Sequence, residues 1–265
     1  MPRDIWVVAS QFKEDVDWLK ESDFPVVLIS KNQGFSDPSF LACHSIPNRG
    51  MEFGSYLWFI CNYWDSIPER VSFIHGHEFS YHQSVSILDA IEMFGDSDFH
   101  GLNGPRFSAC HYFFDELPHP WFGRDFSKMW SFLGMSEVCA PPKRLVCQGG
   151  TQCIVSRDRI KSRPRRFYER MLQGIMENKD HYVLALVLEI SWHIIFGVQA
   201  TGPAMLVPQF DEHCLAHRDS ILLTSPNLLW SSYMKNSINF KEIDSHSEWV
   251  EFCMELLKTF ARPPA

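Results

Sequence analysis

Residues 48–82 read NRGMEFGSYLWFICNYWDSIPERVSFIHGHEFSYH, and this stretch decides the fold. Residues 48–50 predict a loop, because Asn and Gly tolerate backbone angles that other residues avoid. From 51 to 64, apolar residues recur at helical spacing. Residues 71–74 are a short apolar run, which predicts a buried strand that ends in His-Gly-His-Glu. The stretch therefore predicts a loop, a helix, a buried strand and a candidate site.

The polar tip of this predicted strand is a candidate ligand site. In an open α/β sheet, ligands gather just beyond the carboxyl ends of the strands. Alternation along an extended segment would place His75 and His77 on the same face. Together with Glu78 and His82 they could bind Zn²⁺ or Mn²⁺. They could also contact a phosphate or hydroxyl group without a metal, or hold the loop after the strand together.

The sequence before this stretch predicts a parallel sheet. Residues 5–10 (IWVVAS) and 25–30 (PVVLIS) are apolar and β-rich, and 11–20 carries apolar residues at helical spacing. A strand, a helix and a second strand in this order are typical of the βαβ unit. Residues 35–48 are rich in Ser, Pro and Asn, which predicts a loop.

The rest of the chain continues this alternation. We expect a helix at 85–93, a strand at 99–102, a short helix at 126–133, two short strands around a Gly-Gly kink at 145–155, helices at 164–177 and 182–196, an irregular segment at 198–240 and a closing helix at 247–260. The sequence has no repeat, low-complexity tract or clear linker. It therefore predicts a single α/β domain over residues 1–265, with a mainly parallel central sheet flanked by helices and an irregular C-terminal segment.

Composition and charge exclude several classes of protein. The 265 residues are 45% hydrophobic, which is enough for one large domain. A net charge of −8 argues against a general nucleic-acid binder, whose affinity needs excess Lys and Arg. The first residues lack a signal-peptide layout, and no apolar run reaches the roughly 18 residues that cross a bilayer. We therefore expect a soluble, cytoplasmic protein without a transmembrane segment.

The eight cysteines include no CxxC pair. Several lie inside apolar segments, and an intracellular chain rarely keeps disulfides. We therefore expect reduced, buried thiols.

Asp96-Ser97-Asp98 is a D-x-D motif. Enzymes that handle nucleotide sugars often use this pattern to hold Mn²⁺ on the diphosphate. Asp is also common in turns, and here the motif lies between a predicted helix and a strand, where turn residues belong. Asp96 and Asp98 are therefore candidate metal ligands, with a turn as the alternative.

Two further segments carry candidate site residues. The run from Gln148 to Gln152 contains Gly149 and Gly150, which either let the backbone approach a ligand closely or form a β-bulge. Basic residues cluster at 157–170, which predicts a solvated helix face or a contact with an anionic ligand or acidic partner. GxGxxG, P-loop, GxSxG and HExxH motifs are absent from the sequence, so dinucleotide, NTPase, hydrolase and zincin functions lack support.

Glu189 is the candidate catalytic base. It lies among apolar residues of a predicted helix, where a carboxylate is costly to bury unless it is paired or functional. His193 lies one turn further on the same face. Such a pair could deprotonate an acceptor hydroxyl, whereas an exposed Glu on an amphipathic helix is the alternative.

Four segments carry a resemblance to a known family. Residues 7–19, 47–77, 149–171 and 188–197 resemble an uncharacterised domain family found in fungi and large DNA viruses, and they cover most of the core at 5–197. The order of the same features is also similar, more distantly, to glycosyltransferases of the GT-A fold, including rhamnan-synthesis and fringe-like enzymes.

The second resemblance implies a GT-A, Rossmann-like fold and a set of roles. Ala9 and Ser10 would contact the nucleotide of a UDP- or GDP-linked sugar. Asn48, Arg49 and Glu52 would flank the sugar nucleotide. His75 and His77 would face the diphosphate. Gly149, Gly150 and Gln152 would line the acceptor side, and Glu189 would be the base.

The sequence departs from that family at the metal motif, because His-Gly-His stands where D-x-D is expected. Dependence on Mn²⁺ or Mg²⁺ is therefore open. An enzyme without a metal would stabilise the leaving diphosphate with cationic side chains, for which Arg49, Arg106 or a protonated His are candidates.

The sequence thus favours a glycosyltransferase that moves a sugar from a nucleotide donor to a hydroxyl of a glycan or glycoprotein. One alternative is a metal-dependent hydrolase built on His75, His77 and His82. The other is a non-catalytic glycan-binding or structural domain.

Overall fold

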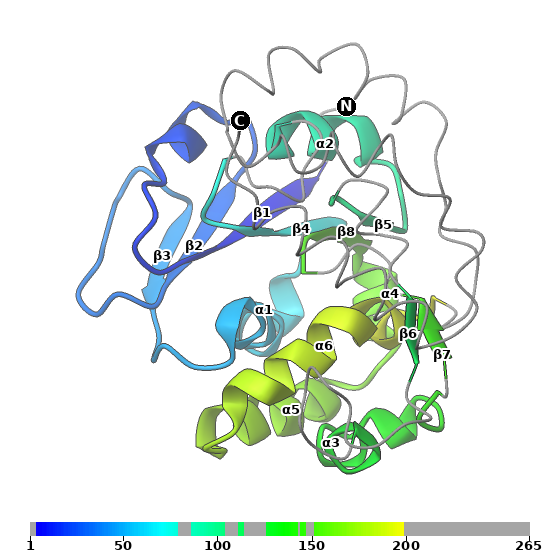
Figure 1. The fold of residues 1–265 in the computed structure, drawn as a ribbon. Helices are drawn as coiled ribbons and strands as arrows, with labels where there is room; N and C mark the ends of the chain where they lie inside the picture. The colour runs from blue at the N-terminus through cyan, green and yellow to red at the C-terminus, as the bar shows by residue number, and fades with distance from the viewer. Residues whose placement is uncertain are drawn as a thin grey trace, which may run out of the picture.

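A six-stranded sheet forms the centre of the protein in the computed structural model, in the order β3-β2-β1-β4-β8-β5 (Figure 1). The structure describes residues 4–78, 86–103, 111–113, 126–142, 144–146 and 151–198. The strands are β1 (Ile5–Gln11), β2 (Val26–Ser30), β3 (Ala42–Ser45), β4 (Arg70–His75), β5 (Phe99–Gly101) and β8 (Cys153–Ser156). A separate antiparallel pair joins β6 (His111–Phe113) to β7 (Arg144–Val146).

The sheet is mixed. Parallel pairing joins β1 to β2, β1 to β4 and β2 to β3, whereas β8 is antiparallel to both β4 and β5. The prediction of an α/β fold with a mainly parallel central sheet is confirmed, with β8 as the reversed strand.

Helices cover both faces of this sheet. They are α1 (Met51–Asn62), α2 (Ile87–Phe94), α3 (Phe126–Phe132), α4 (Arg157–Lys161), α5 (Arg165–Glu177) and α6 (His181–Ile195). Figure 1 shows α2 on one face, and α1, α5 and α6 on the other. None of the helices in the described ranges is long and apolar enough to cross a membrane.

Alternation along the strands produces two apolar cores. Val8 of β1 and Phe73 of β4 point to the side of α1, α5 and α6, where they join the larger cluster. Val7 and Ile74 point to the side of α2 and join the smaller one. The strands are therefore buried on both faces, as expected for parallel strands between two helical layers.

Two local predictions were wrong. The helix expected at 11–20 is an extension of β1, a loop and the 3₁₀ helix η1 (Asp17–Glu21). The Glu14 carboxylate accepts hydrogen bonds from the backbone of residues 12 and 13, and Asp15 accepts one from the backbone of residue 17. Such side-chain acceptors compete with a regular helix.

The loop expected at 35–48 contains β3. This strand has four residues and none of them is fully buried, so it gave no hydrophobic pattern. It is specified by pairing with β2.

The remaining predicted elements have mixed outcomes. Ser156 caps α4, because its Oγ accepts a hydrogen bond from the backbone of Arg159. The strands expected at 145–155 exist, but β7 belongs to the small sheet and β8 to the large one. The irregular segment and the closing helix, at 198–240 and 247–260, lie outside the described residues apart from Val198.

Gly54 permits the close approach of the loop before α1. A Cβ at this position would lie 2.2 Å from the carbonyl oxygen of Arg49, which is backbone and cannot swing away. The contact therefore fixes the path of the chain into the helix.

We expect Gly54→Ala to destabilise the protein by about 2 kcal/mol, although Gly→Ala within a helix normally stabilises. Gly174→Ala is the matched control, because the atoms nearest its Cβ would belong to the ring of Phe132, a side chain that is 54% exposed rather than backbone. Urea unfolding of both variants measures the difference. Equal stability changes would contradict a backbone collision at Gly54.

Candidate functional site

The carboxyl ends of the parallel strands meet at a topological switch point. The chain continues from β1 to β2 and β3 on one side, while β4 lies on the other side of β1. Ligands of open α/β sheets bind outside the strands at such a point. Since β8 is antiparallel, its first residues reach the same edge, and so do the residues after β5.

His75 ties the end of β4 to the start of β8. Its backbone N–H donates to Gln152 Oε1 at 3.0 Å, and its Nε2 forms a hydrogen bond with Thr151 Oγ1. The amide of Gln152 in turn donates to Asn103 Oδ1 at 3.0 Å. His75 Nε2 also lies 4.0 Å from Glu52 Oε1 of α1. Burial lowers the pKa of His75, against the opposing effect of Glu52.

His77 lies on a different side of the strand tip. Its side chain is 52% exposed, and its Nε2 lies 3.6 Å from Glu14 Oε1 in the loop after β1. Burial acts to raise the pKa of Glu14, but hydrogen bonds from the backbone and the charge of His77 hold it below its usual value. His75 therefore faces α1 and β8, whereas His77 faces the loop after β1.

The loop before α1 joins three elements. Arg49 donates from its guanidinium to the carbonyl of Asn178 at 2.5 Å, and the backbone N–H of Gly50 donates to His181 Nδ1 at 3.1 Å. Gly50 has φ 69°, which favours glycine. These bonds attach the amino end of α1 to the turn between α5 and α6.

Lys31 directly follows β2, and sequence analysis did not single it out. Its Nζ donates to the carbonyl of Arg49 at 3.3 Å. Burial lowers its pKa to about 8, although Glu52 and Glu14 act in the opposite direction. The signal that could have found it is the one used for His75, a polar residue at the carboxyl end of a predicted parallel strand.

Glu189 belongs to the same group of charges. Burial raises its pKa to about 7, and the nearby carboxylate of Glu52 raises it further. Glu52 therefore acts electrostatically on both His75 and Glu189. The imidazole at the tip of β4 and the carboxyl of Glu189 in α6 thus share Glu52 as a charged neighbour.

His193 is placed differently from Glu189. It is 1% exposed, and neither ring nitrogen has a hydrogen-bond partner among the residues that the structure describes. Burial lowers its pKa to about 3, so the ring is neutral at physiological pH. In this state His193 is a core side chain of α6.

Only some of the residues expected to bind the nucleotide and sugar lie at the switch-point edge of the sheet. Ser10 reaches the correct edge, where its Oγ lies 2.8 Å from Ser55 Oγ of α1. Ala9 points to the other face of the sheet and is buried in the core below α2. Asn48 is exposed in the loop before α1.

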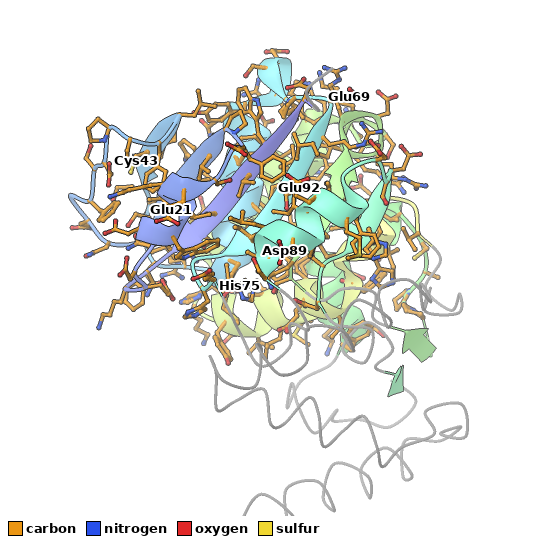
Figure 2. The ribbon with its side chains drawn as sticks, turned by 90° about the horizontal axis from the view of Figure 1, so that it is seen from above. Glu21, Cys43, Glu69, His75, Asp89 and Glu92 are labelled. Atoms are coloured by element: carbon orange, nitrogen blue, oxygen red, sulfur yellow. The ribbon has the colours of Figure 1, made fainter. Side chains whose placement is uncertain are left out.

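Asp96 and Asp98 lie at the opposite end of the sheet. The carbonyl of Asp96 accepts a hydrogen bond from the guanidinium of Arg70, the first residue of β4, and the carbonyl of Asp98 accepts one from Ser156. Figure 2 shows the two ends of β4, with Glu69 labelled at one end and His75 at the other. The D-x-D motif therefore cannot share a metal ion with His75 or His77.

Four of the candidate residues, His82, Arg106, Gly149 and Gly150, lie outside the described residues. In the ranges that are described, no group of three or more His, Cys, Asp or Glu side chains could hold a metal ion.

Two arginines of the basic cluster at 157–170 have a structural role. Arg159 donates to the carbonyl of Phe196 at 2.8 Å, and Arg163 donates to that of Ile195 at 3.2 Å. These carbonyls belong to the last turn of α6, whose partial negative charge attracts cations.

The fold and this edge define the class of protein. It is an open α/β protein whose switch point carries buried and half-buried ionisable side chains from β4, α1 and the residue after β2, with Glu189 of α6 coupled to them through the charge of Glu52. The chain belongs to the family described as "Protein of unknown function (DUF3431)", which matches residues 6–103 and 116–214. The expectation of an uncharacterised family is thereby confirmed. No curated protein and no solved structure matches the chain.

The raised pKa of Glu189 makes the stability of the protein depend on pH. Its folded-state pKa is about 7, above its ordinary value of 4.5, so the folded state holds the proton more tightly. Below pH 4.5 both states are protonated and the effect vanishes. Between 4.5 and 7 the unfolded state loses its proton first, and stability falls.

We therefore expect Glu189→Gln, which cannot ionise, to be more stable than the wild type at pH 8 by up to about 3 kcal/mol. At pH 4 the two proteins should be equally stable. Urea unfolding across this range measures the difference, with the exposed Glu177→Gln as control. A pH-independent difference would contradict the burial of an ionisable Glu189.

Proposed function

We propose that this protein is a glycosyltransferase, which moves a sugar from a nucleotide-sugar donor to a hydroxyl of a glycan or glycoprotein. One observation carries the proposal: a carboxyl with a pKa of about 7, on Glu189, shares Glu52 as a neighbour with the strand tip at the switch point. A general base works best when its pKa lies near the operating pH.

In this proposal Glu189 takes the proton of the acceptor hydroxyl. The acceptor oxygen attacks the anomeric carbon of the donor sugar, and the bond between that carbon and the diphosphate oxygen breaks. The electron pair of the broken bond stays on the diphosphate. Burial keeps Glu189 basic, and Glu52 adds to this effect because its charge disfavours a second negative charge close by.

The donor lies across the switch point in this proposal. Ser10 and Arg49 reach that edge from β1 and from the loop before α1. His75 bonds to Thr151 and Gln152 and so holds the residues just before β8 in place at this edge. A Mn²⁺ or Mg²⁺ ion would accompany the donor diphosphate if the reaction needs a metal.

The first test identifies the donor. A thermal-shift panel of UDP-, GDP- and TDP-linked sugars, each with and without Mn²⁺, should reveal one that stabilises the protein. A donor at a hundred times its dissociation constant stabilises the fold by about 2.7 kcal/mol. If no nucleotide sugar shifts the transition, the glycosyltransferase proposal is rejected and a non-catalytic glycan-binding or structural domain is favoured.

The second test addresses the base. With that donor, Glu189→Gln should lower the rate of transfer by about 10² to 10⁴-fold, because the acceptor proton has no base to receive it. Its affinity for the donor should stay within about twofold of the wild type. Glu177→Gln, on the exposed face of α5, is the matched control and should keep the wild-type rate. Normal turnover by Glu189→Gln would eliminate the proposed role.

The rate should also depend on pH in a defined direction. Only the ionised form of Glu189 accepts a proton, so the rate at saturating donor should rise tenfold per pH unit below about 7 and level off above it. A rate that falls over the range from pH 5 to 7 would contradict Glu189 as base.

A further inference from the structure

Lys31 is a buried cation that the roles above do not use. The residue is 6% exposed, and its backbone N–H donates to the carbonyl of Gln11 at 2.7 Å, which fixes it beside the end of β1. An ammonium group has three hydrogen-bond donors. In the described part of the chain its Nζ makes one hydrogen bond, to the carbonyl of Arg49, and no ion pair.

A buried ammonium without a carboxylate partner is costly, and such groups are typical of functional sites. Glu52 and Glu14 are close enough to favour its charged form, but burial outweighs them. The position of Lys31 therefore calls for an explanation beyond packing.

The amino end of α1 adds positive character at the same place. Lys31 Nζ bonds the carbonyl of Arg49, which lies two residues before this twelve-residue helix. Gly50 at the cap has no side chain, so the first turn is not capped by one. The Nε of Arg49 is buried and has no hydrogen-bond partner among the described residues. A helix amino end with free N–H groups attracts phosphate.

We propose that Lys31 and the amino end of α1 form the phosphate-binding part of the site, and as a role in sugar transfer this inference rests on the proposed function. The ammonium donates to an oxygen of the diphosphate. When the bond from the sugar to the diphosphate breaks, negative charge grows on the leaving oxygen, and a preorganised cation stabilises that charge. Glu189 receives the acceptor proton in the same step.

The experiment compares Lys31→Met with the wild type. Isothermal titration with inorganic pyrophosphate, UDP and GDP is run once in EDTA and once in Mn²⁺. We expect affinity to fall about 10- to 100-fold for at least one of these probes, as for the loss of a hydrogen bond to a charged group. Lys161→Met is the control, since this exposed lysine lies in α4 at the other end of the sheet.

Folding of the variant is controlled separately. Methionine matches the length of lysine and removes a buried charge, but it leaves the carbonyl of Arg49 without this donor, so the titration is run well below the unfolding temperature of Lys31→Met. A second measurement uses the wild type alone. Pyrophosphate should slow reductive methylation of Lys31, read by mass spectrometry, and leave Lys161 unaffected.

The outcomes separate this inference from the proposed function. Unchanged affinity in Lys31→Met under both conditions overturns the inference, and so does a wild type that binds none of the three probes. Binding that depends on Lys31 without any sugar transfer supports the phosphate site and rejects the glycosyltransferase. Sugar transfer by the wild type, together with wild-type affinity of Lys31→Met for the probes, supports the glycosyltransferase and rejects the phosphate site.

Discussion

The carbonyl oxygen of Arg49 is the point on which the site depends. Lys31 donates to it from the end of β2, and the bare Cα face of Gly54 lies against it from the first turns of α1. The guanidinium of the same residue bonds the carbonyl of Asn178, between α5 and α6. One peptide unit therefore sets how α1 approaches the sheet, and the side chain next to it connects that helix to α6.

Aromatic packing fixes the position of α6 relative to α1 and β4. The ring of Trp192 in α6 packs edge-on against Phe53 of α1 and Phe73 of β4, with centroids 5.2 and 6.2 Å apart. Such contacts fix both the rotation and the height of α6 above the sheet. Because Glu189 lies one turn before this ring, the same packing keeps it within electrostatic range of Glu52.

The sequence predicted most of the strands and helices that position the site, but fewer of the surroundings of its individual side chains. Apolar runs revealed β1, β2 and β4, since buried parallel strands read as continuous hydrophobic segments. They could not reveal β3, which depends on pairing with β2, or the loop after β1, where the carboxylates of Glu14 and Asp15 replace helical bonds. Glu189 could be predicted because it interrupts an apolar helix. The different surroundings of Ala9, His193 and the D-x-D motif depend on contacts between distant segments, which a local pattern does not contain.

The bond between Gly50 and His181 has a chemical consequence. A ring nitrogen that accepts a hydrogen bond carries no proton, so His181 is in the neutral tautomer with its hydrogen on Nε2. Burial and the cations of Arg49 and Lys31 lower the pKa of this imidazole, which favours that form in the folded state. Acidification below the ordinary histidine range would set two N–H groups against each other, and stability would fall as the pH drops. Acid thus weakens one of the two hydrogen bonds that join the segment before α1 to the turn between α5 and α6.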